Sequence, residues 1–235
     1  MADKNTFDAI IIGCGIAGAS LAYFLAERGM KDILIIEREE HPGYHATGRA
    51  AAVLVEMDLV PSVLQLKLLG AKFLRNPPEG FSEHPILRRS GILIMFQGEL
   101  WEQVGQMVPA LRQMGAVVDV LSQEETVSKI PVVSPENFDG ALLLPEDGHL
   151  DVNELLWSYL RHARRSGAQL RLKEEVRGIK ADQGSCYGVI TNVGKYRCRW
   201  VINAAGAWAK YQRSPGPIPG GAYALSQNNH YICRT

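Results

Sequence analysis

The sequence predicts an α/β fold in which a domain with a parallel sheet is joined to an incomplete α+β domain with an antiparallel sheet. Apolar runs of strand length, Phe7 to Ile12 and Ile33 to Ile36, alternate with segments of helical apolar spacing, as in βαβ units. In the middle of the chain, residues 90–96 have a strand pattern and 99–114 a helical one. At 235 residues the chain is long for one domain and short for two.

Composition limits the classes of partner. Hydrophobic residues make up 46% of the chain and charged residues 21%, so a core can form. The 25 basic and 25 acidic residues give a net charge of +0, which argues against a nucleic-acid partner. We expect no metal site and no disulfide framework, because no C-x-x-C spacing occurs among Cys14, Cys186, Cys198 and Cys233.

The same reading gives an expected location. The amino terminus carries an apolar run too short for a secretion signal, and 18 consecutive apolar residues occur nowhere. We therefore expect a cytoplasmic protein with no transmembrane segment. Peripheral membrane contact and the oligomeric state stay open.

The first forty residues follow the order strand, glycines, helix, strand, acid. The strand Phe7 to Ile12 is followed by G-x-G-x-x-G, and residues 16–28 have helical spacing. Gly13 permits a tight turn, Gly15 lets the backbone approach a pyrophosphate, and Gly18 lets helix and strand pack closely. This predicts a Rossmann-like dinucleotide site in preference to a glycine-rich turn without a ligand.

Glu37 stands at the end of the second strand, where a carboxylate accepts hydrogen bonds from the ribose hydroxyls of the adenosine half. A 2′-phosphate there would meet a second negative group in a poorly solvated pocket. The motif alone does not separate FAD from NAD, and an NAD-binding regulatory module is an alternative at this point.

The next stretch, EREEHPGYHATGRAAAV, separates the two cofactors. It resembles the flavin-proximal segment of the D-amino-acid oxidase superfamily, the glycine oxidase and sarcosine oxidase group, and within it the bacterial D-arginine dehydrogenases most. The resemblance implies FAD, with this loop wrapping the pyrophosphate and running beneath the flavin. The cofactor-binding residues expected here and in the glycine segment, besides the three glycines and Glu37, are Ala17, Arg38, Ala46, Thr47, Gly48, Arg49, Ala50, Ala51 and Ala52.

Two residues of this loop have alternative interpretations. Arg49 offers a fixed positive charge to a phosphate or a reduced flavin, or else forms a surface salt bridge. His45 is favoured as a hydrogen-bonding loop residue over a covalent flavin attachment point. No catalytic residue is assigned.

The second half of the chain returns to the cofactor domain. We expect a helix over residues 152–165, a parallel strand over 169–176, a hairpin with arms 188–192 and 195–199, and a buried strand over 200–206. Earlier, Ser122 and Glu125 form a capping box for a short helix. The resemblance implies a backbone contact of Val176 with the adenine. It also implies that the last strand brings four residues to the dinucleotide, namely Ala204, Ala205, Gly206 and Trp208.

The expected domain limits follow from these assignments. Residues 1–55 and 141–209 form the FAD-binding domain, and residues 56–140 form a partial substrate domain. After Ala209 the resemblance ends and prolines and glycines cluster, so we expect residues 210–235 to be an aberrant tail, a frameshift product of a truncated chain.

The resemblance implies an FAD-dependent oxidoreductase that oxidises a small-molecule amine or a D-amino acid by hydride transfer to the flavin. Val53 and Ile92 stand where D-arginine dehydrogenases carry a histidine and the acid that recognises the guanidinium, so a less basic substrate is favoured. The alternative is a non-catalytic fragment or a subunit that lacks the substrate-binding half.

Overall fold

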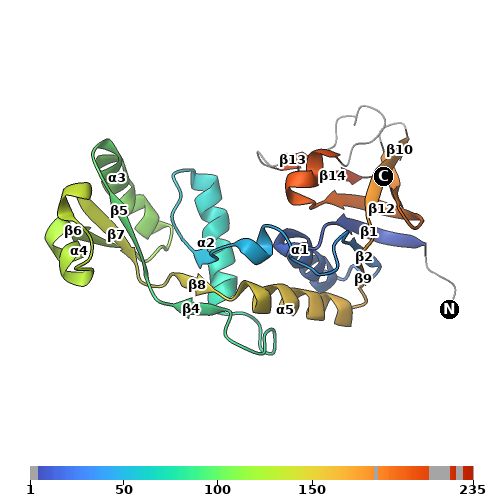
Figure 1. Cartoon of the computed structure of the whole chain (residues 1–235), viewed down its shortest axis with the longest axis horizontal. Helices are drawn as coiled ribbons and strands as arrows, with labels where there is room; N and C mark the ends of the chain where they lie inside the picture. Colours follow the sequence, from blue (N-terminus) through green and yellow to red (C-terminus); the bar gives the residue numbers. More distant parts are fainter. Residues whose placement is uncertain (1–4, 183–184, 212–222, 226–229, 235) are drawn as a thin grey trace. The chain divides into compact units, whose positions relative to one another are not determined.

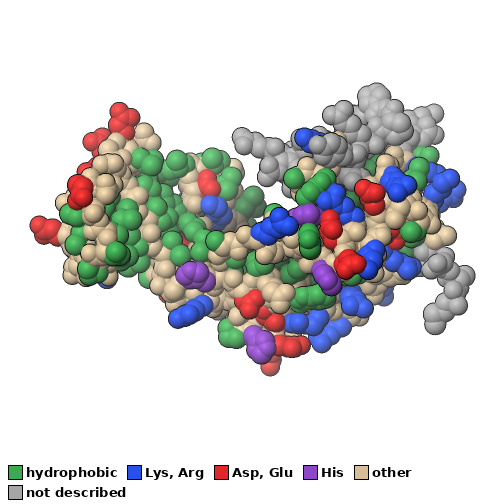
Figure 2. All heavy atoms as spheres, in the orientation of Figure 1, with side chains coloured by type: hydrophobic (Ala, Val, Ile, Leu, Met, Phe, Trp, Pro, Cys, Tyr) green, Lys and Arg blue, Asp and Glu red, His purple; other side chains and the backbone are tan. Residues whose placement is uncertain are grey.

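The structure is a computed structural model that describes residues 5–182, 185–211, 223–225 and 230–234. The chain divides into two compact units (Figure 1). Unit 1 contains residues 1–50 and 152–235, and unit 2 contains residues 51–151. Acidic and basic side chains lie interspersed over the visible face of unit 1 (Figure 2), in keeping with the net charge of +0.

Unit 1 is built on a mixed sheet whose centre is parallel. Its strand order is β10-β11-β12-β1-β2-β9, with β1 parallel to both β12 and β2, and β2 parallel to β9. Isoleucine and leucine side chains of β1 and β2 are fully buried, which is typical of parallel strands covered on both faces. The bounds are β1 Thr6–Ile12, β2 Ile33–Ile36, β9 Gln169–Arg171, β10 Val176–Asp182, β11 Ser185–Thr191 and β12 Lys195–Asn203.

Two helices of unit 1 lie side by side, α1 (Ile16–Glu27) and α5 (Val152–Arg165). The rings of Tyr23 and Tyr159 join them, with centroids 5.4 Å apart. The 3-10 turns η1 (Thr47–Arg49) and η3 (Gly206–Tyr211) follow the second strand and the last parallel strand. The predicted helices over 16–28 and 152–165 are thereby confirmed, the first ending one residue earlier.

Unit 2 contains two antiparallel three-stranded sheets, in the orders β3-β8-β4 and β5-β7-β6. A core of apolar side chains from α2, α3, β5 and β7 holds it together. The elements are β3 Val53–Leu54, α2 Pro61–Arg75, β4 Leu87–Arg89, β5 Ile92–Phe96, α3 Glu99–Gln113, β6 Asp119–Ser122, α4 Gln123–Lys129, η2 Pro135–Asn137, β7 Gly140–Leu144 and β8 Gly148–Leu150.

The predicted capping box opens α4. The Ser122 hydroxyl accepts a hydrogen bond from the Glu125 backbone N–H at 3.1 Å, and the Ser122 N–H donates to the Glu125 carboxylate at 2.7 Å. The predicted fold class is confirmed, with a mostly parallel mixed sheet in one unit and antiparallel sheets in the other.

Three expectations differ from the structure. The strand predicted over 169–176 ends at Arg171, because Lys173 has a φ of +57° and turns the chain away before β10. The hairpin arm at 195–199 and the strand at 200–206 are one strand, β12, which pairs with β1 from Arg197 to Asn203. Residues 141–151, expected in the FAD-binding domain, belong to unit 2, because β7 and β8 pair with strands there.

The segment expected to be an aberrant tail contributes two strands to the sheet of unit 1. These are β13 (Tyr223–Leu225) and β14 (His230–Arg234), and β14 pairs antiparallel with β12. The rest of the tail, residues 212–222, 226–229 and 235, lies outside the described residues. No helix in the described part of the chain is long and apolar enough to cross a membrane.

Candidate functional site

The glycine turn after β1 is closed on several sides. Gly13 has a φ of +100°, and a Cβ there would lie 2.6 Å from the Ala204 carbonyl oxygen. A Cβ on Gly18 would lie 2.0 Å from the Gly13 carbonyl oxygen. These positions require glycine, because the backbone that follows β12 and the helix α1 both pack directly on the turn.

The first turn of α1 is held by a residue from a distant loop. Gly15 is the N-cap and supplies no side-chain cap. Instead the Thr47 hydroxyl accepts a hydrogen bond from the Ile16 N–H at 3.0 Å. The helix amino terminus carries partial positive charge and faces a cavity, which is a favourable arrangement for an anion.

Glu37 holds the glycine turn and the segment after β2 together. Its carboxylate accepts hydrogen bonds from the Cys14 N–H at 2.8 Å and from the Glu39 N–H at 3.0 Å. Two backbone donors fix the orientation of the side chain. The carboxylate lines the cavity with acceptor capacity left for hydroxyl donors.

The loop over residues 41–49 folds back on α1. The Gly43 N–H donates to the Cys14 carbonyl at 2.9 Å, and the Gly48 N–H donates to the Gly43 carbonyl at 2.7 Å. A Cβ on Gly43 would lie 2.6 Å from a methyl carbon of Leu156. The loop is therefore pressed between α1 and α5, with Thr47 facing the helix amino terminus.

The end of β12 is shaped by Asn203, which is 1% exposed. Its side-chain amide donates to the Ala209 carbonyl at 2.9 Å, and its side-chain oxygen accepts from the Ala205 N–H at 3.1 Å. These bonds set the turn into η3 and direct the following residues toward the cavity. Sequence reasoning missed Asn203, although a polar residue at the end of an apolar strand is a recognisable sign.

A charged and aromatic cluster borders one side of the cavity. The Arg38 guanidinium lies 4.1 Å from the Trp208 ring centroid, and the His45 ring lies 4.2 Å from the same ring. The Glu39 carboxylate accepts from His45 Nε2 at 2.8 Å and from Arg38 Nε at 2.9 Å. These hydrogen bonds, that with His45 first, lower the pKa of Glu39, so its negative charge is retained beside the Arg38 guanidinium.

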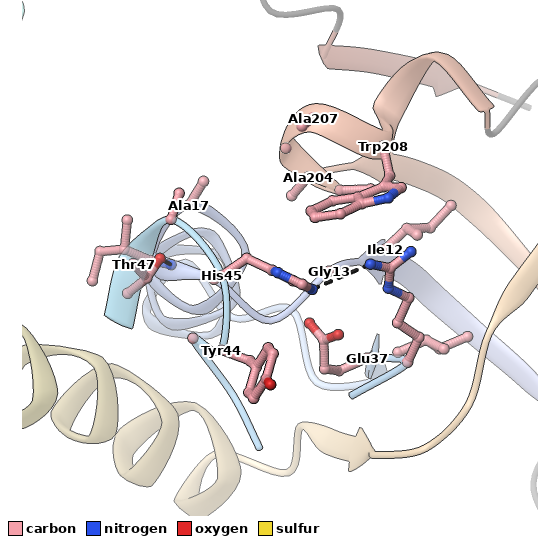
Figure 3. A pocket seen from close by; sticks show the side chains of 18 of the residues that line it. Ile12, Gly13, Ala17, Glu37, Tyr44, His45, Thr47, Ala204, Ala207 and Trp208 are labelled. Carbon is pink, nitrogen blue, oxygen red and sulfur yellow. Dashed lines mark hydrogen bonds between the residues drawn. The ribbon is translucent and has the colours of Figure 1, made fainter. Parts of the chain in front are cut away.

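These segments enclose one cavity of about 510 Å³ (Figure 3). Thr47 and Ala17 lie together at one end, and His45, Trp208 and Glu37 lie toward the other. The predicted cofactor-binding residues that line it are Gly13, Gly15, Ala17, Glu37, Arg38, Ala46, Thr47, Arg49, Val176, Ala205, Gly206 and Trp208.

Five residues of the predicted set do not line this cavity in the described part of the chain: Gly18, Gly48, Ala50, Ala51 and Ala52. Gly18 faces the glycine turn, and Ala51 and Ala52 belong to unit 2. Ala204, which the resemblance also brings to the dinucleotide, lines the cavity too. Other residues line it without having been assigned to the site: Ile12, Ile16, Ile36, Gly43, Tyr44, His45, Glu174 and Ala207. Ile12 and Ile36 could have been found as the last residues of two parallel strands.

Arg49 and the thiols have distinct surroundings. The Arg49 guanidinium lies 5.6 Å from the Tyr44 ring centroid, and the structure shows no ion pair for it within the described residues. Cys14 and Cys198 are free and buried. Burial, with Glu37 contributing, raises the pKa of Cys14 to about 12, so this thiol stays neutral.

The chain matches the family model of the FAD dependent oxidoreductases, DAO, over residues 8–231. The chain therefore belongs to the FAD-dependent oxidoreductase family DAO, and the predicted resemblance and cofactor, FAD, are confirmed. The match runs past Ala209, where the resemblance was expected to end.

Several known proteins are similar to this chain in sequence, and solved structures are similar to it in fold. The human mitochondrial dimethylglycine dehydrogenase is 26% identical over 212 residues, which cover 88% of this chain and 24% of that protein. Sarcosine oxidase subunit beta of Rhizobium meliloti is 26% identical, covering 86% of this chain and 50% of the subunit. The glycine oxidase structure from Geobacillus kaustophilus has a TM-score of 0.75 at 22% identity, covering 97% of this chain and 70% of that chain.

The chain matches only part of the length of the relatives named above. The chain spans 24% of the length of the first curated relative it matches.

The residues of unit 1 fit FAD. The glycine turn leaves no room for side chains at Gly13, the amino terminus of α1 suits a pyrophosphate, and the Glu37 carboxylate suits ribose hydroxyls. Arg38 and Arg49 supply positive charge on the cavity wall. Donors, acceptors and charges are thus arranged for an anionic dinucleotide.

Proposed function

We propose that unit 1 is the FAD-binding domain and that its cavity is the FAD site. Gly13, Gly15 and Thr47, with the amino terminus of α1, hold the pyrophosphate, and Glu37 holds the adenosine ribose. The observation that carries this proposal is that four separated segments, residues 12–17, 36–49, 174–176 and 204–208, line a single cavity.

We further propose that the protein containing this chain oxidises the carbon–nitrogen bond of a small amine or amino acid, with a D-amino acid as the favoured substrate. Bound FAD supplies the hydride acceptor. Residues of this chain hold it in place and exclude water, and Arg49 places a fixed cation on the cavity wall. Membership of the family and similarity to an amine dehydrogenase support this reading.

Unit 2 is proposed to be part of the substrate domain. Val53 in β3 is 44% exposed and Ile92 opens β5, and neither side chain can form an ion pair with a guanidinium. A substrate less basic than D-arginine is therefore favoured.

The first experiment tests cofactor binding. The purified chain is mixed with FAD, and binding is followed by the change in flavin fluorescence and by the rise in melting temperature that a ligand specific for the folded state produces. The expected result is saturable binding to the chain, weakened by the Glu37→Gln substitution. A folded chain, shown by circular dichroism, that does not bind FAD overturns the proposal.

A second candidate function is a non-catalytic FAD-binding part of a larger assembly. It is favoured by the coverage of the relatives, since the chain spans 50% of a protein that is itself one subunit of sarcosine oxidase. Anaerobic mixing of the FAD-loaded chain with a panel of amines and D-amino acids separates the two. Bleaching of the flavin by one of them supports the enzyme, and bound flavin that no amine reduces supports the second candidate.

A further inference from the structure

Glu174 is a buried carboxylate on the cavity wall that the functions described above do not use. It lies in the turn between β9 and β10, is 5% exposed, and lines the cavity. Its backbone N–H donates to the Glu37 carbonyl at 3.0 Å, and the Lys173 N–H donates to the Glu39 carbonyl at 3.0 Å. The turn is thus fastened to the segment that carries the ribose-binding carboxylate.

One oxygen of this carboxylate has a partner within the protein. The Thr191 hydroxyl donates to Glu174 Oε1 at 2.6 Å. Thr191 is itself fixed, since its oxygen accepts from the Gly194 N–H at 3.0 Å. This fixes the orientation of the Glu174 side chain at the cavity wall.

The other oxygen, Oε2, has no hydrogen-bond partner among the residues that the structure describes. A buried acceptor without a donor carries a large desolvation cost, and carboxylates in such places normally meet a donor from the protein or from a ligand. Because Glu174 lines the cavity, the missing donor is expected from the molecule that the cavity binds.

The position of Glu174 along the dinucleotide follows from its neighbours. In this kind of fold the pyrophosphate lies at the helix amino terminus and the ribose at the acid that ends the second strand. The base lies beyond the ribose. Glu174 is hydrogen-bonded to Glu37 and stands two residues before Val176, which also lines the cavity, so it borders the place of the base.

The chemistry of the base completes the assignment. A carboxylate only accepts hydrogen bonds, and the exocyclic N6 amine is the group of adenine that donates them, whereas N7 accepts. We propose that Glu174 reads the adenine of FAD by accepting a hydrogen bond from its N6 amine. This inference depends on the proposed function, that the cavity holds FAD.

A structural role alone makes a different prediction. If Glu174 only anchored Thr191 and the turn that follows, its replacement would weaken the binding of every flavin dinucleotide equally. If it reads the base, replacement changes the preference between two bases that differ at position 6.

The experiment compares FAD with flavin hypoxanthine dinucleotide, in which a carbonyl oxygen replaces the N6 amine. Dissociation constants are measured by flavin fluorescence with the full 235-residue chain. The chain is expected to prefer FAD by about 10- to 100-fold, because the carboxylate faces an acceptor in the analogue. In Glu174→Gln, whose amide can donate as well as accept, the preference is expected to fall to about threefold or less.

Glu175→Gln is the matched control. Glu175 is the adjacent residue, its side chain is 51% exposed, and it pairs with Arg177. This variant should keep the preference for FAD unchanged. Melting temperatures without cofactor show that each variant is folded.

The outcomes are distinct. Equal affinity of the unsubstituted chain for both dinucleotides overturns the role of Glu174 and leaves the FAD site intact. Equal weakening of both by Glu174→Gln, with the preference kept, also overturns it and assigns the residue to the turn. Failure of a folded chain to bind either dinucleotide overturns both the inference and the proposed function.

Discussion

The carboxylate of Glu37 accepts a hydrogen bond from the backbone N–H of Cys14 at 2.8 Å, although β2 and the whole of α1 separate them in sequence. The bond joins the acid at the end of β2 to the glycine turn at the end of β1. This hydrogen bond ties the position of the carboxylate to that of the turn. The two features that the dinucleotide motif requires are therefore coupled before a ligand binds.

Glu37→Gln tests this coupling. The amide group can accept on one side only, so either Cys14 or Glu39 loses its acceptor. We expect unfolding free energy to fall by about 1–3 kcal/mol and FAD affinity to fall by about 10- to 100-fold. Urea unfolding and fluorescence titration measure the two effects. Glu40→Gln, at an exposed glutamate paired with Lys173, should change neither, and an unchanged affinity in Glu37→Gln would contradict the ribose role.

Gly18→Ala tests the close packing of α1 on the glycine turn. The added methyl group would meet the Gly13 carbonyl oxygen at 2.0 Å, so the helix must shift, at a cost of about 1–3 kcal/mol. Gly70→Ala is the control, because Gly70 is exposed in the interior of α2 with no atom within 4 Å of an added Cβ. That substitution should stabilise the protein by about 0.5–1 kcal/mol. Denaturant unfolding measures the unfolding free energy of both variants. Equal changes in Gly18→Ala and Gly70→Ala would refute the close packing of α1 on the glycine turn.

Arg75→Leu tests a buried ionic network in unit 2. The Arg75 guanidinium pairs with Glu56 and, at 3.0 Å, with Asp147, whose side chains are 3% and 1% exposed. Its removal leaves two buried carboxylates facing each other and should cost about 3–5 kcal/mol of unfolding free energy. The control is Arg89→Leu, which breaks the exposed pair with Glu146 and should cost less than about 1 kcal/mol.

The loss in Arg75→Leu should also depend on pH. Burial, the largest cause, already raises the pKa of Asp147, and Arg75 works against that rise. Without Arg75 the folded state binds a proton more readily than the unfolded chain. Stability of the variant is therefore retained at low pH and lost as pH rises through the raised pKa. A destabilisation that is the same at about pH 4 and about pH 7 would show that the carboxylates are not its cause.

The buried thiol of Cys14 gives an alkaline pH dependence. Its pKa of about 12 in the folded state exceeds the ordinary value of 9.0, so the unfolded chain releases the proton first. Stability is complete below pH 9 and falls as pH rises toward 12, by up to about 1.4 kcal/mol per pH unit. Cys14→Ala should reduce this slope, leaving the share of Cys198, whose pKa is also about 12. Urea midpoints measured between about pH 9 and pH 12 test this prediction. Identical slopes of stability against pH for the unsubstituted chain and for Cys14→Ala would contradict it.

The sequence predicts elements whose pattern is local. The isoleucine runs of β1 and β2, the helix α5 and the capping box at Ser122 are all visible within a few neighbouring residues. The turn at Lys173, which separates β9 from β10, is not visible in this way, because a lysine in the left-handed region has no sequence signature. The continuity of β12 past Arg199 is set by its pairing with β1, which a hairpin pattern does not reveal.

The site shows the same division. Glycines and Glu37 follow a fixed order and could be predicted, whereas the approach of His45 to Trp208 depends on two distant segments that the fold brings together. Glu174 could not be found from sequence. The pattern predicted one strand over residues 169–176, and nothing in that strand distinguished Glu174 from its polar neighbours.

The division of unit 1 into two chain segments has a consequence for synthesis. Ile11 of β1 pairs with Ile202 of β12, and at roughly 5–20 residues per second the ribosome needs about 10 to 40 s to make the chain between them. During that interval the nascent β1 has an unsatisfied edge and uncovered isoleucines. Apolar surface that waits this long for its partner strand is prone to aggregation.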